Sequence, residues 1–153
     1  MNKKRDSLIK LNSNIYRCTQ AYLDQKLIKY ELTIGTYPYL MVLNREPGIS
    51  QNDISRELNI DKAMSARSIK KLIELGYIIK EENEEDVRAY KLYITEKAKI
   101  IIPDIRKIIF EWIDILVEGY SDEEVEIIIG FLERVLVNGK NYRKKQCERM
   151  KKG

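Results

Sequence analysis

Four basic side chains lie within a ten-residue span of the segment DKAMSARSIKKLIEL, residues 61–75, and no carboxylate separates them. If the segment is a helix, its outward-facing residues are Lys62, Met64, Arg67, Lys70 and Lys71. The side chains of its first turn are small and accessible, which suits insertion into the major groove of DNA. We expect Arg67 to bond guanine through two hydrogen bonds, and Lys70 and Lys71 to neutralise phosphates. The charges alone leave a second interpretation open, in which an exposed basic face is merely solvated.

The residues before this segment predict the helices that would position it. Ser50 and Gln51 begin a short predicted helix, whose backbone and side-chain donors can bond a phosphate. Ser50 with Asp53, and then Asp61, are of the types that cap the starts of helices. Gly76 predicts the end of the second helix. Two short helices joined by a tight turn make a helix-turn-helix unit.

The apolar periodicity elsewhere predicts further helices and one β-hairpin. We expect helices over residues 6–30, 39–45, 50–58, 61–75, 95–117 and 121–136, and strands over 77–82 and 89–95. Ile69, Leu72 and Ile73 of the helix are expected to face the core, and Tyr90, Leu92 and Ile94 of the second strand are expected to alternate on one face. Ser121 and Glu124 predict a capping box for the last helix, and the basic tail over 140–152 is expected to fray.

These elements predict a mainly α fold with a small β-hairpin, namely a winged helix-turn-helix with long N- and C-terminal dimerisation helices. We treat residues 1–153 as one domain, with dimerisation arms over 1–30 and 96–153 and a DNA-binding lobe over 34–95. The arms carry more apolar surface than one chain of this length can cover. Burial against the same arms of a second copy predicts a two-fold homodimer.

The stretch GISQNDISRELNIDKAMSARSIKKLIELGYI, followed by EEDVRAYKLYIT, resembles the MarR family (multiple antibiotic resistance regulators) of bacterial transcription factors. The most specific element is the Asp-x-Arg of the wing, here Asp86-Val87-Arg88. The resemblance implies a dimeric winged helix that binds a pseudo-palindromic double-stranded DNA operator, usually as a repressor. It also implies, as for many relatives, release from DNA on binding a small aromatic or phenolic effector. By the same resemblance, Arg88 enters the minor groove and Asp86 orients it.

The hairpin that carries Arg88 is strongly acidic, with five carboxylates in positions 81–86. A lone arginine is drawn into a narrow minor groove by the negative potential there, so the acidity is tolerable if only Arg88 reaches in. We hypothesise that the glutamates weaken non-specific binding, and the alternative that they keep the hairpin tip soluble stays open. The recognition helix departs from the family pattern, since Ala63, Met64 and Ala66 stand where many relatives carry hydroxyl residues.

The composition offers no catalytic constellation other than one assembled from scattered carboxylates. Histidine, the commonest general base and metal ligand, is absent from the 153 residues. The sequence also lacks a glycine-rich phosphate loop, a Gly-x-Ser-x-Gly motif and spaced metal ligands. We therefore expect no enzyme and no cofactor. The alternative is a winged helix that serves protein contacts without DNA binding, and the intact Arg67, Lys71 and Arg88 argue against it.

Charge, cysteine usage and hydropathy together predict a cytoplasmic protein. The net charge of +4 permits a nucleic acid partner without requiring one. No apolar run approaches the roughly 18 residues that span a bilayer, so we expect no membrane partner. Cys18 and Cys147 lack the spacing of metal or disulfide frameworks. For Cys18, a small packed residue is the favoured interpretation over a redox sensor.

The aromatic residues raise the question of an effector site. Ten tyrosines and one tryptophan are present, and we expect Tyr16, Tyr37, Tyr39 and Trp112 near the junction of the arms and the lobe. A ring with a hydroxyl suits a phenolic ligand, but it suits a helix interface equally well. Packing is the favoured interpretation of these four residues.

Overall fold

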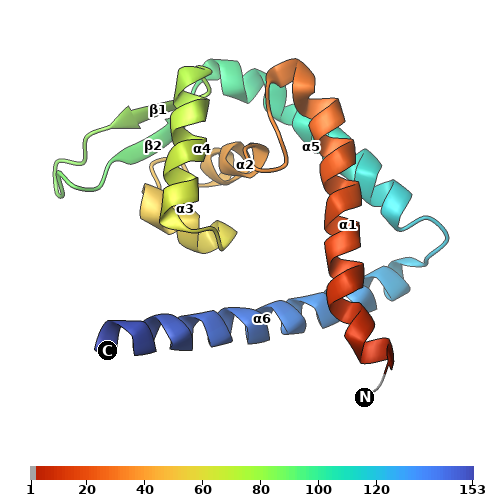
Figure 1. Ribbon diagram of the computed structural model, residues 1–153. Coiled ribbons are helices and arrows are strands. Elements are labelled where there is room, and N and C mark those ends of the chain that lie inside the picture. The colour runs from red at the N-terminus through yellow and green to blue at the C-terminus, as the bar shows by residue number, and fades with distance from the viewer. Residues whose placement is uncertain (1–2) are drawn as a thin grey trace. The chain divides into compact units, whose positions relative to one another are not determined.

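The computed structural model describes residues 3–153, which form helices and one β-hairpin (Figure 1). The elements are α1 (Lys3–Leu27), η1 (Ile28–Tyr30), α2 (Tyr37–Arg45), α3 (Gln51–Leu58), α4 (Lys62–Glu74), β1 (Ile78–Glu81), β2 (Lys91–Ile94), α5 (Glu96–Leu116) and α6 (Asp122–Lys152). The chain divides into two compact units, the first ending at Ile113 and the second running from Asp114 to Gly153. The predicted fold class, helix-turn-helix followed by a wing and flanked by long helices, is confirmed.

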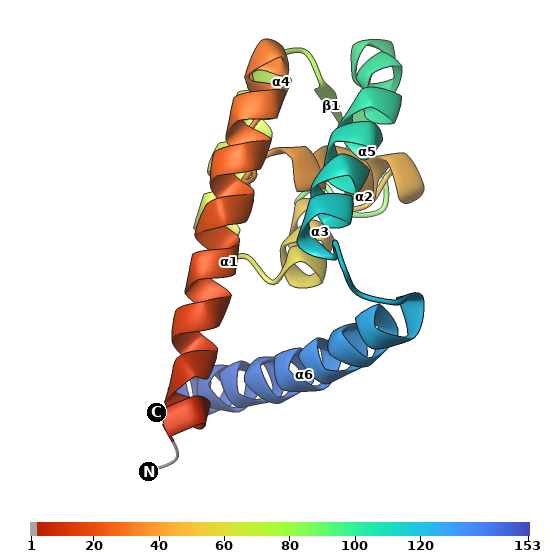
Figure 2. The same ribbon diagram turned by 90° about the vertical axis from the view of Figure 1, so that its right-hand side faces the viewer.

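The first unit has one hydrophobic core, to which α1 contributes only its last turns. Fully buried large side chains come from the chain between α1 and α5, and they include Leu27, Leu32, Tyr39, Leu40, Leu43, Ile54, Leu72, Ile78, Leu92 and Ile105. In α1, Leu23 and Leu27 are buried, whereas Leu8, Ile9 and Ile15 nearer its start are exposed. Figure 2 shows α1 as one uninterrupted helix, so its exposed part continues directly from its packed part.

The helix starts predicted from capping residues are confirmed. The Ser50 hydroxyl accepts a hydrogen bond from the Asp53 backbone N–H at 3.2 Å and thereby caps α3. The Asp61 carboxylate accepts one from the Met64 backbone N–H at 2.8 Å and caps α4. Gly76 follows α4 with a φ of +77°, a conformation that favours glycine. Local chemistry therefore sets the length of both helices in the helix-turn-helix.

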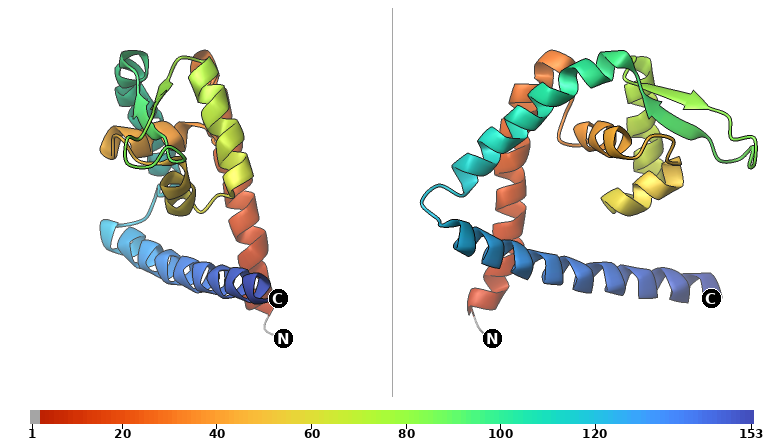
Figure 3. Two further views of the ribbon diagram at one scale, coloured as in Figure 1. Left: turned by 90° about the vertical axis from the view of Figure 1, so that its left-hand side faces the viewer. Right: turned by 180° about the vertical axis from the view of Figure 1, so that it is seen from behind.

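The wing is an antiparallel hairpin whose β2 strand is paired on both sides. Ile78 of β1 lies opposite Ile94 of β2. On the other side of β2, Gly48 N–H donates to the Leu92 carbonyl at 2.8 Å, and Leu92 N–H donates to the Ile49 carbonyl at 3.2 Å. Figure 3 shows the hairpin extending past α3 and α4. The loop before α3 therefore holds the base of the wing against the helix-turn-helix.

Several predicted boundaries and inward-facing residues differ from the structure. Both strands are shorter than predicted, and Tyr90 precedes β2 with 39% of its surface exposed. Ile73, predicted to face the core, is 37% exposed because only Ile69 and Leu72 of that group lie on the packed side of α4. The first helix ends at Leu27, and a single 3-10 turn completes the predicted span.

The second unit consists mainly of α6, which begins with the predicted capping box. Glu124 N–H donates to the Ser121 hydroxyl at 3.2 Å, and Ser121 N–H donates to the Glu124 carboxylate at 2.8 Å. The helix then continues to Lys152, so the expectation that residues 140–152 fray was wrong. Within residues 3–153, none of the α6 side chains is buried.

Candidate nucleic-acid interface

Helix α4 is fixed by one side and presents its basic side to solvent. Ile69 and Leu72 are buried and anchor it to the core. The predicted contact residues on α4 are all exposed: Lys62, Ala63, Met64, Arg67, Lys70 and Lys71. Among the residues that the structure describes, its four basic side chains have no carboxylate within ion-pair distance. Their charge is therefore available to an external anion.

A buried hydrogen bond also sets the position of α4. The Tyr39 hydroxyl of α2 donates to the Ser65 hydroxyl of α4 at 3.1 Å, and both residues are fully buried. Ser65 lies on the first full turn of α4, between the exposed Met64 and Ala66. Because a buried polar group is costly without its partner, this bond disfavours rotation of α4 about its axis. The tyrosine thus helps to hold the exposed side of α4 outward.

The start of α3 offers backbone donors more readily than the Ser50 side chain does. The Ser50 hydroxyl already donates to the Asp53 carboxylate at 2.8 Å while it caps the helix. The N–H groups of Gln51 and Asn52, in the first turn of α3, have no partner inside the helix. These two N–H groups are the backbone donors that the start of α3 could offer to a phosphate.

At the tip of the wing, Asp86 shapes the backbone that carries Arg88. The Asp86 carboxylate accepts a hydrogen bond from the Arg88 backbone N–H at 3.0 Å, and the Asp86 carbonyl accepts one from Ala89 N–H at 3.0 Å. Asn83 makes a similar side-chain turn with the backbone N–H of Glu85 at 3.0 Å. Within residues 3–153, the Arg88 guanidinium forms no ion pair. Asp86 thus orders the loop and leaves the Arg88 guanidinium uncommitted.

A cavity of about 250 Å³ lies between the start of α3 and the wing. Ser50 and Gln51 line it on one side, and Arg88 lines it on the other. Three predicted contact residues from two distant stretches of sequence are therefore brought to one place. Lys80 and Tyr90 also line this cavity.

Sequence reasoning missed Lys80 and Tyr90 as site residues. The Lys80 ammonium lies 4.0 Å from the centre of the Tyr90 ring, a cation–π contact across the hairpin. The signal available in the sequence was a lysine on one predicted strand and an aromatic residue at the start of the other. Their meeting depends on the hairpin register, in which Lys80 lies opposite Leu92. The register places a further positive charge in the cavity that Arg88 also lines.

The four aromatic residues proposed for an effector site lie in different environments in the single chain. Tyr39 is in the core with its hydroxyl bonded to Ser65, and Tyr16 is 54% exposed on α1. Trp112 stacks on Tyr22 with ring centres 4.7 Å apart, and its indole N–H donates to the Thr19 hydroxyl at 2.9 Å.

Tyr37, the fourth of these residues, is partly buried, and burial raises the pKa of its hydroxyl. Trp112 and Tyr39 thus have structural partners, and an effector pocket remains a prediction.

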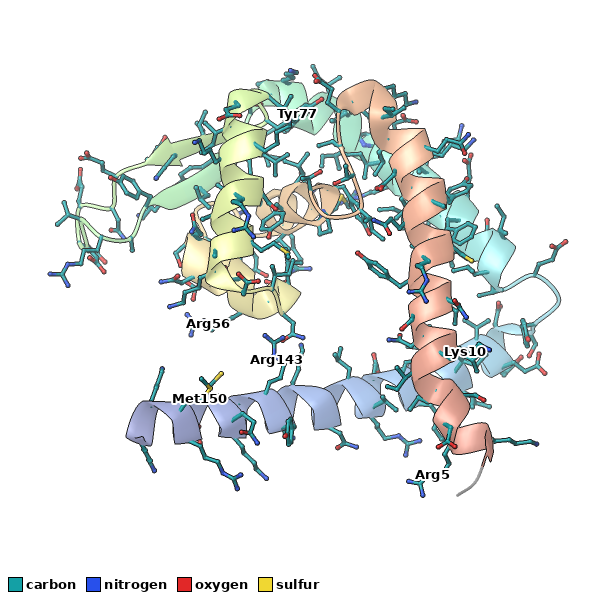
Figure 4. The ribbon with its side chains drawn as sticks, in the orientation of Figure 1. Arg5, Lys10, Arg56, Tyr77, Arg143 and Met150 are labelled. Atoms are coloured by element: carbon teal, nitrogen blue, oxygen red, sulfur yellow. The ribbon has the colours of Figure 1, made fainter. Side chains whose placement is uncertain are left out.

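A polar cluster joins the end of the first helical segment to α5. The Lys29 ammonium lies 2.7 Å from the Asp104 carboxylate, and the Tyr30 hydroxyl donates to that same carboxylate at 2.6 Å. The bonds from Lys29 and Tyr30 hold the pKa of Asp104 below its usual value, and the bond to Asp104 raises the pKa of Tyr30. The Tyr77 hydroxyl donates to the Tyr30 carbonyl at 2.9 Å, and Figure 4 labels Tyr77 just beyond α4. These contacts connect the arm to the helix-turn-helix inside the first unit.

Neither cysteine is paired or buried. Cys18 and Cys147 are both exposed free thiols, so the interpretation of Cys18 as a packed residue was wrong for the single chain. Of the helices within residues 3–153, none combines the length and apolar content needed to cross a bilayer.

Two short helices with an exposed basic second helix, followed by a hairpin, define a winged helix-turn-helix protein. The family model for the MarR family matches residues 30–89. The HTH-type transcriptional regulator BilQ of Clostridioides difficile (strain CD3) is 34% identical over 134 residues, which cover 88% of this chain and 90% of that protein. The chain belongs to the MarR family of transcriptional regulators.

Solved structures agree with this assignment. A MarR transcriptional regulator from Methanosarcina mazei Go1 is similar with a TM-score of 0.82 and 38% identity, covering 89% of this chain and 98% of that one. A mutant MarR from E. coli, solved in complex with operator DNA, is similar with a TM-score of 0.78. At 18% identity, and with 84% of this chain and 93% of that one covered, the second likeness shows the fold alone.

Proposed function

We propose that this chain is a sequence-specific, double-stranded DNA-binding regulator that acts in the cytoplasm as a homodimer on a pseudo-palindromic operator. The observation that carries this proposal is the exposed basic side of α4, anchored from behind by Ile69 and Leu72. Inserted into a major groove, it would present Arg67 and Lys62 to base edges. The uncommitted Arg88 guanidinium would then enter the adjacent minor groove.

A dimer is proposed because the arms expose apolar surface that one chain does not cover. In α6, Ile128, Leu132, Val135 and Leu136 follow helical spacing and are each at least 44% exposed. In α1, Leu8, Leu11 and Ile15 are similarly exposed. A second copy would bury both sets and place two α4 helices on half-sites about one DNA turn apart.

Repression with release by a small aromatic effector is the regulatory mode that we propose for this dimer. An effector would act through its differential affinity for a lobe spacing that does not match successive major grooves. The contacts of Tyr30, Tyr77 and Asp104 support this idea, since they connect the arm to the end of α4 within one chain. A movement of the arm would therefore change contacts at α4.

The test is selection of bound fragments from a random duplex library at near-physiological salt, with wild type beside Arg88→Ala and Arg67→Ala. We expect an enriched pseudo-palindrome, weaker binding by Arg88→Ala, and relaxed preference at one base pair for Arg67→Ala, worth about 1–3 kcal/mol. Lys99→Ala, on the exposed side of α5, is the control and should select the same site. An intact dimer that enriches no sequence would contradict the proposal and favour a protein-interaction module.

A further inference from the structure

The last turns of α6 contain the whole positive excess of the chain. Residues 140–153 hold seven of the 28 basic residues and one of the 24 acidic residues, Glu148. The other 139 residues therefore carry 21 basic and 23 acidic side chains, a net charge of −2. Within the DNA-binding lobe, residues 34–95, nine basic side chains are outnumbered by ten acidic ones. Despite its basic α4, the lobe as a whole does not attract a polyanion over long range.

These seven side chains are presented on a continuous helix. All of them are exposed: Lys140, Arg143, Lys144, Lys145, Arg149, Lys151 and Lys152. Figure 4 shows side chains, Arg143 and Met150 among them, projecting from α6. Within residues 3–153, Lys144, Lys145 and Lys151 have no ion-pair partner. We call residues 140–152 the basic segment.

Helix stability does not account for the basic segment. Cations near a helix C-terminus are favourable, but this effect is confined to the last turn, and Lys140 to Lys145 lie farther back. Lys140 with Lys144, and Lys145 with Arg149, are like charges four residues apart, an arrangement that destabilises a helix. The segment therefore carries an electrostatic cost that a polyanionic partner would relieve.

The composition of the basic segment suits neither the proposed dimer interface nor binding to a membrane surface. The apolar face of α6 becomes discontinuous after Val137, because the positions that would continue it include Gly139, Arg143 and Gln146, with Tyr142 and Met150 as the apolar exceptions. Only Tyr142, Cys147 and Met150 are apolar in the basic segment. An interfacial membrane helix needs a wide apolar face of Trp, Phe and Leu, which is absent there. A backbone of regularly spaced phosphates needs only the exposed positive charges.

We propose that the basic segment binds the phosphate backbone of double-stranded DNA without sequence preference. It supplies the long-range attraction that the net-negative lobe lacks, while α4 and Arg88 select the sequence. This inference rests on the proposed function, because the DNA is the same partner. Each basic side chain that neutralises a phosphate releases a counterion and makes binding more salt-dependent.

The test measures binding of the full-length protein to a random-sequence duplex over a range of salt concentrations. In the variant, Lys144, Lys145 and Lys151 are replaced by Gln, which removes the charge and keeps a similar helix propensity. We expect the slope of log affinity against log salt to become shallower by about 0.9 for each phosphate that is no longer neutralised. At about 0.1 M salt, affinity for random DNA should fall at least about tenfold.

The matched control replaces Lys26, Lys99 and Lys107 by Gln, three exposed lysines on α1 and α5. Net charge falls equally, and the salt slope should stay that of wild type. Hydrogen exchange adds a readout that charge alone does not move, because DNA should protect the amides of residues 140–152. Circular dichroism and the mass in solution check that the variant retains its helix and its assembly.

The outcomes separate this inference from the proposed function. Equal slopes for the two triple variants overturn the basic segment as a DNA contact, whatever the library selection shows. A shallower slope in the basic-segment variant alone supports the inference. This holds even if no operator is enriched and the proposal of a sequence-specific regulator is rejected. If the basic-segment variant loses binding to phosphatidylserine vesicles but binds DNA as wild type does, the inference is overturned and the partner of the segment is a membrane. A wild type that binds no duplex defeats both proposals.

Discussion

The recognition helix α4 and the long helix α6 are held in place by different means. Helix α4 has 13 residues, buries Ser65, Ile69 and Leu72, and is tied to α2 by the Tyr39 hydroxyl. Helix α6 has 31 residues and buries none of them within the described chain. One chain is therefore sufficient to present the proposed DNA-contacting surface of α4, whereas the apolar side of α6 is left uncovered in the described chain. Stability of the lobe and assembly of two lobes should respond to different substitutions.

The largest effect is expected from Leu132→Asp on the apolar face of α6. If this face forms the dimer interface, the substitution places an unpaired carboxylate from each chain in it. The dimer should then separate into monomers that no longer bind the operator. Sedimentation equilibrium measures the mass, and fluorescence anisotropy measures DNA binding. Glu133→Ala, one position along and off that face, should leave both unchanged. A dimer that survives Leu132→Asp would mean that α6 is covered in another way.

The second effect concerns the core behind α4. Leu72 is fully buried, so Leu72→Ala should lower the free energy of unfolding by about 2–5 kcal/mol. Urea denaturation at several protein concentrations measures this decrease, which should persist at concentrations that keep the dimer assembled. Ile79→Ala, at a position 46% exposed on β1, is the control and should change stability by about 0.5 kcal/mol or less. Equal decreases for the two variants would contradict a core centred behind α4.

A smaller effect is expected at the wing, where Asp86 holds the Arg88 backbone. Asp86→Ala removes the hydrogen-bond acceptor, and operator affinity should weaken about three- to tenfold because the loop must then be ordered on binding. Asp86→Asn keeps an acceptor oxygen and removes the charge. Fluorescence anisotropy on the selected operator compares them. Near-wild-type affinity for Asp86→Asn supports the role in the turn, whereas equal weakening of both variants would assign the effect to the charge.

The smallest effect should come from Asp104, whose contacts are near the surface. Its pKa lies below the ordinary value of 3.8, so its stabilising contribution is complete above that pH and disappears as the pH falls through the lower folded value. Asp104→Asn should therefore be slightly less stable than wild type at neutral pH, with a difference that shrinks on acidification. Thermal unfolding across pH measures this, with Asp114→Asn as the control. A difference that grows in acid would contradict the sign of the linkage.

The sequence was sufficient for features that depend on neighbouring residues. The capping roles of Ser50, Asp61 and Ser121 were predicted correctly, because each bonds a backbone N–H three residues ahead. The end of α4 was likewise predicted from the glycine at position 76, whose φ of +77° agrees with that prediction. The exposed side of α4 followed from helical periodicity. Such local rules need no knowledge of distant packing.

Features that depend on distant packing were missed or misplaced. Lys80 and Tyr90 meet only because of the hairpin register, and no short-range pattern encodes that contact. Ile73 lies one position beyond the side of α4 that the core covers, a distinction that periodicity does not resolve.

The tail was expected to fray on the basis of its charge, yet α6 extends through it. Asp86 was expected to orient the Arg88 side chain, and the structure shows its carboxylate bonded to the Arg88 backbone.

The loop before α3 also bears on the solubility of the wing. Its bonds to Leu92 occupy the outer edge of β2, so β1, with only four residues, is the open edge of this hairpin. Lys80 and Glu81 on β1 further discourage a strand of another molecule from pairing there. Gly48 permits this arrangement, since its φ is +86° and an added Cβ would lie 3.1 Å from the Tyr93 hydroxyl oxygen. A larger residue at position 48 would be strained by this φ and crowded by Tyr93, and it should therefore weaken the pairing that covers the β2 edge.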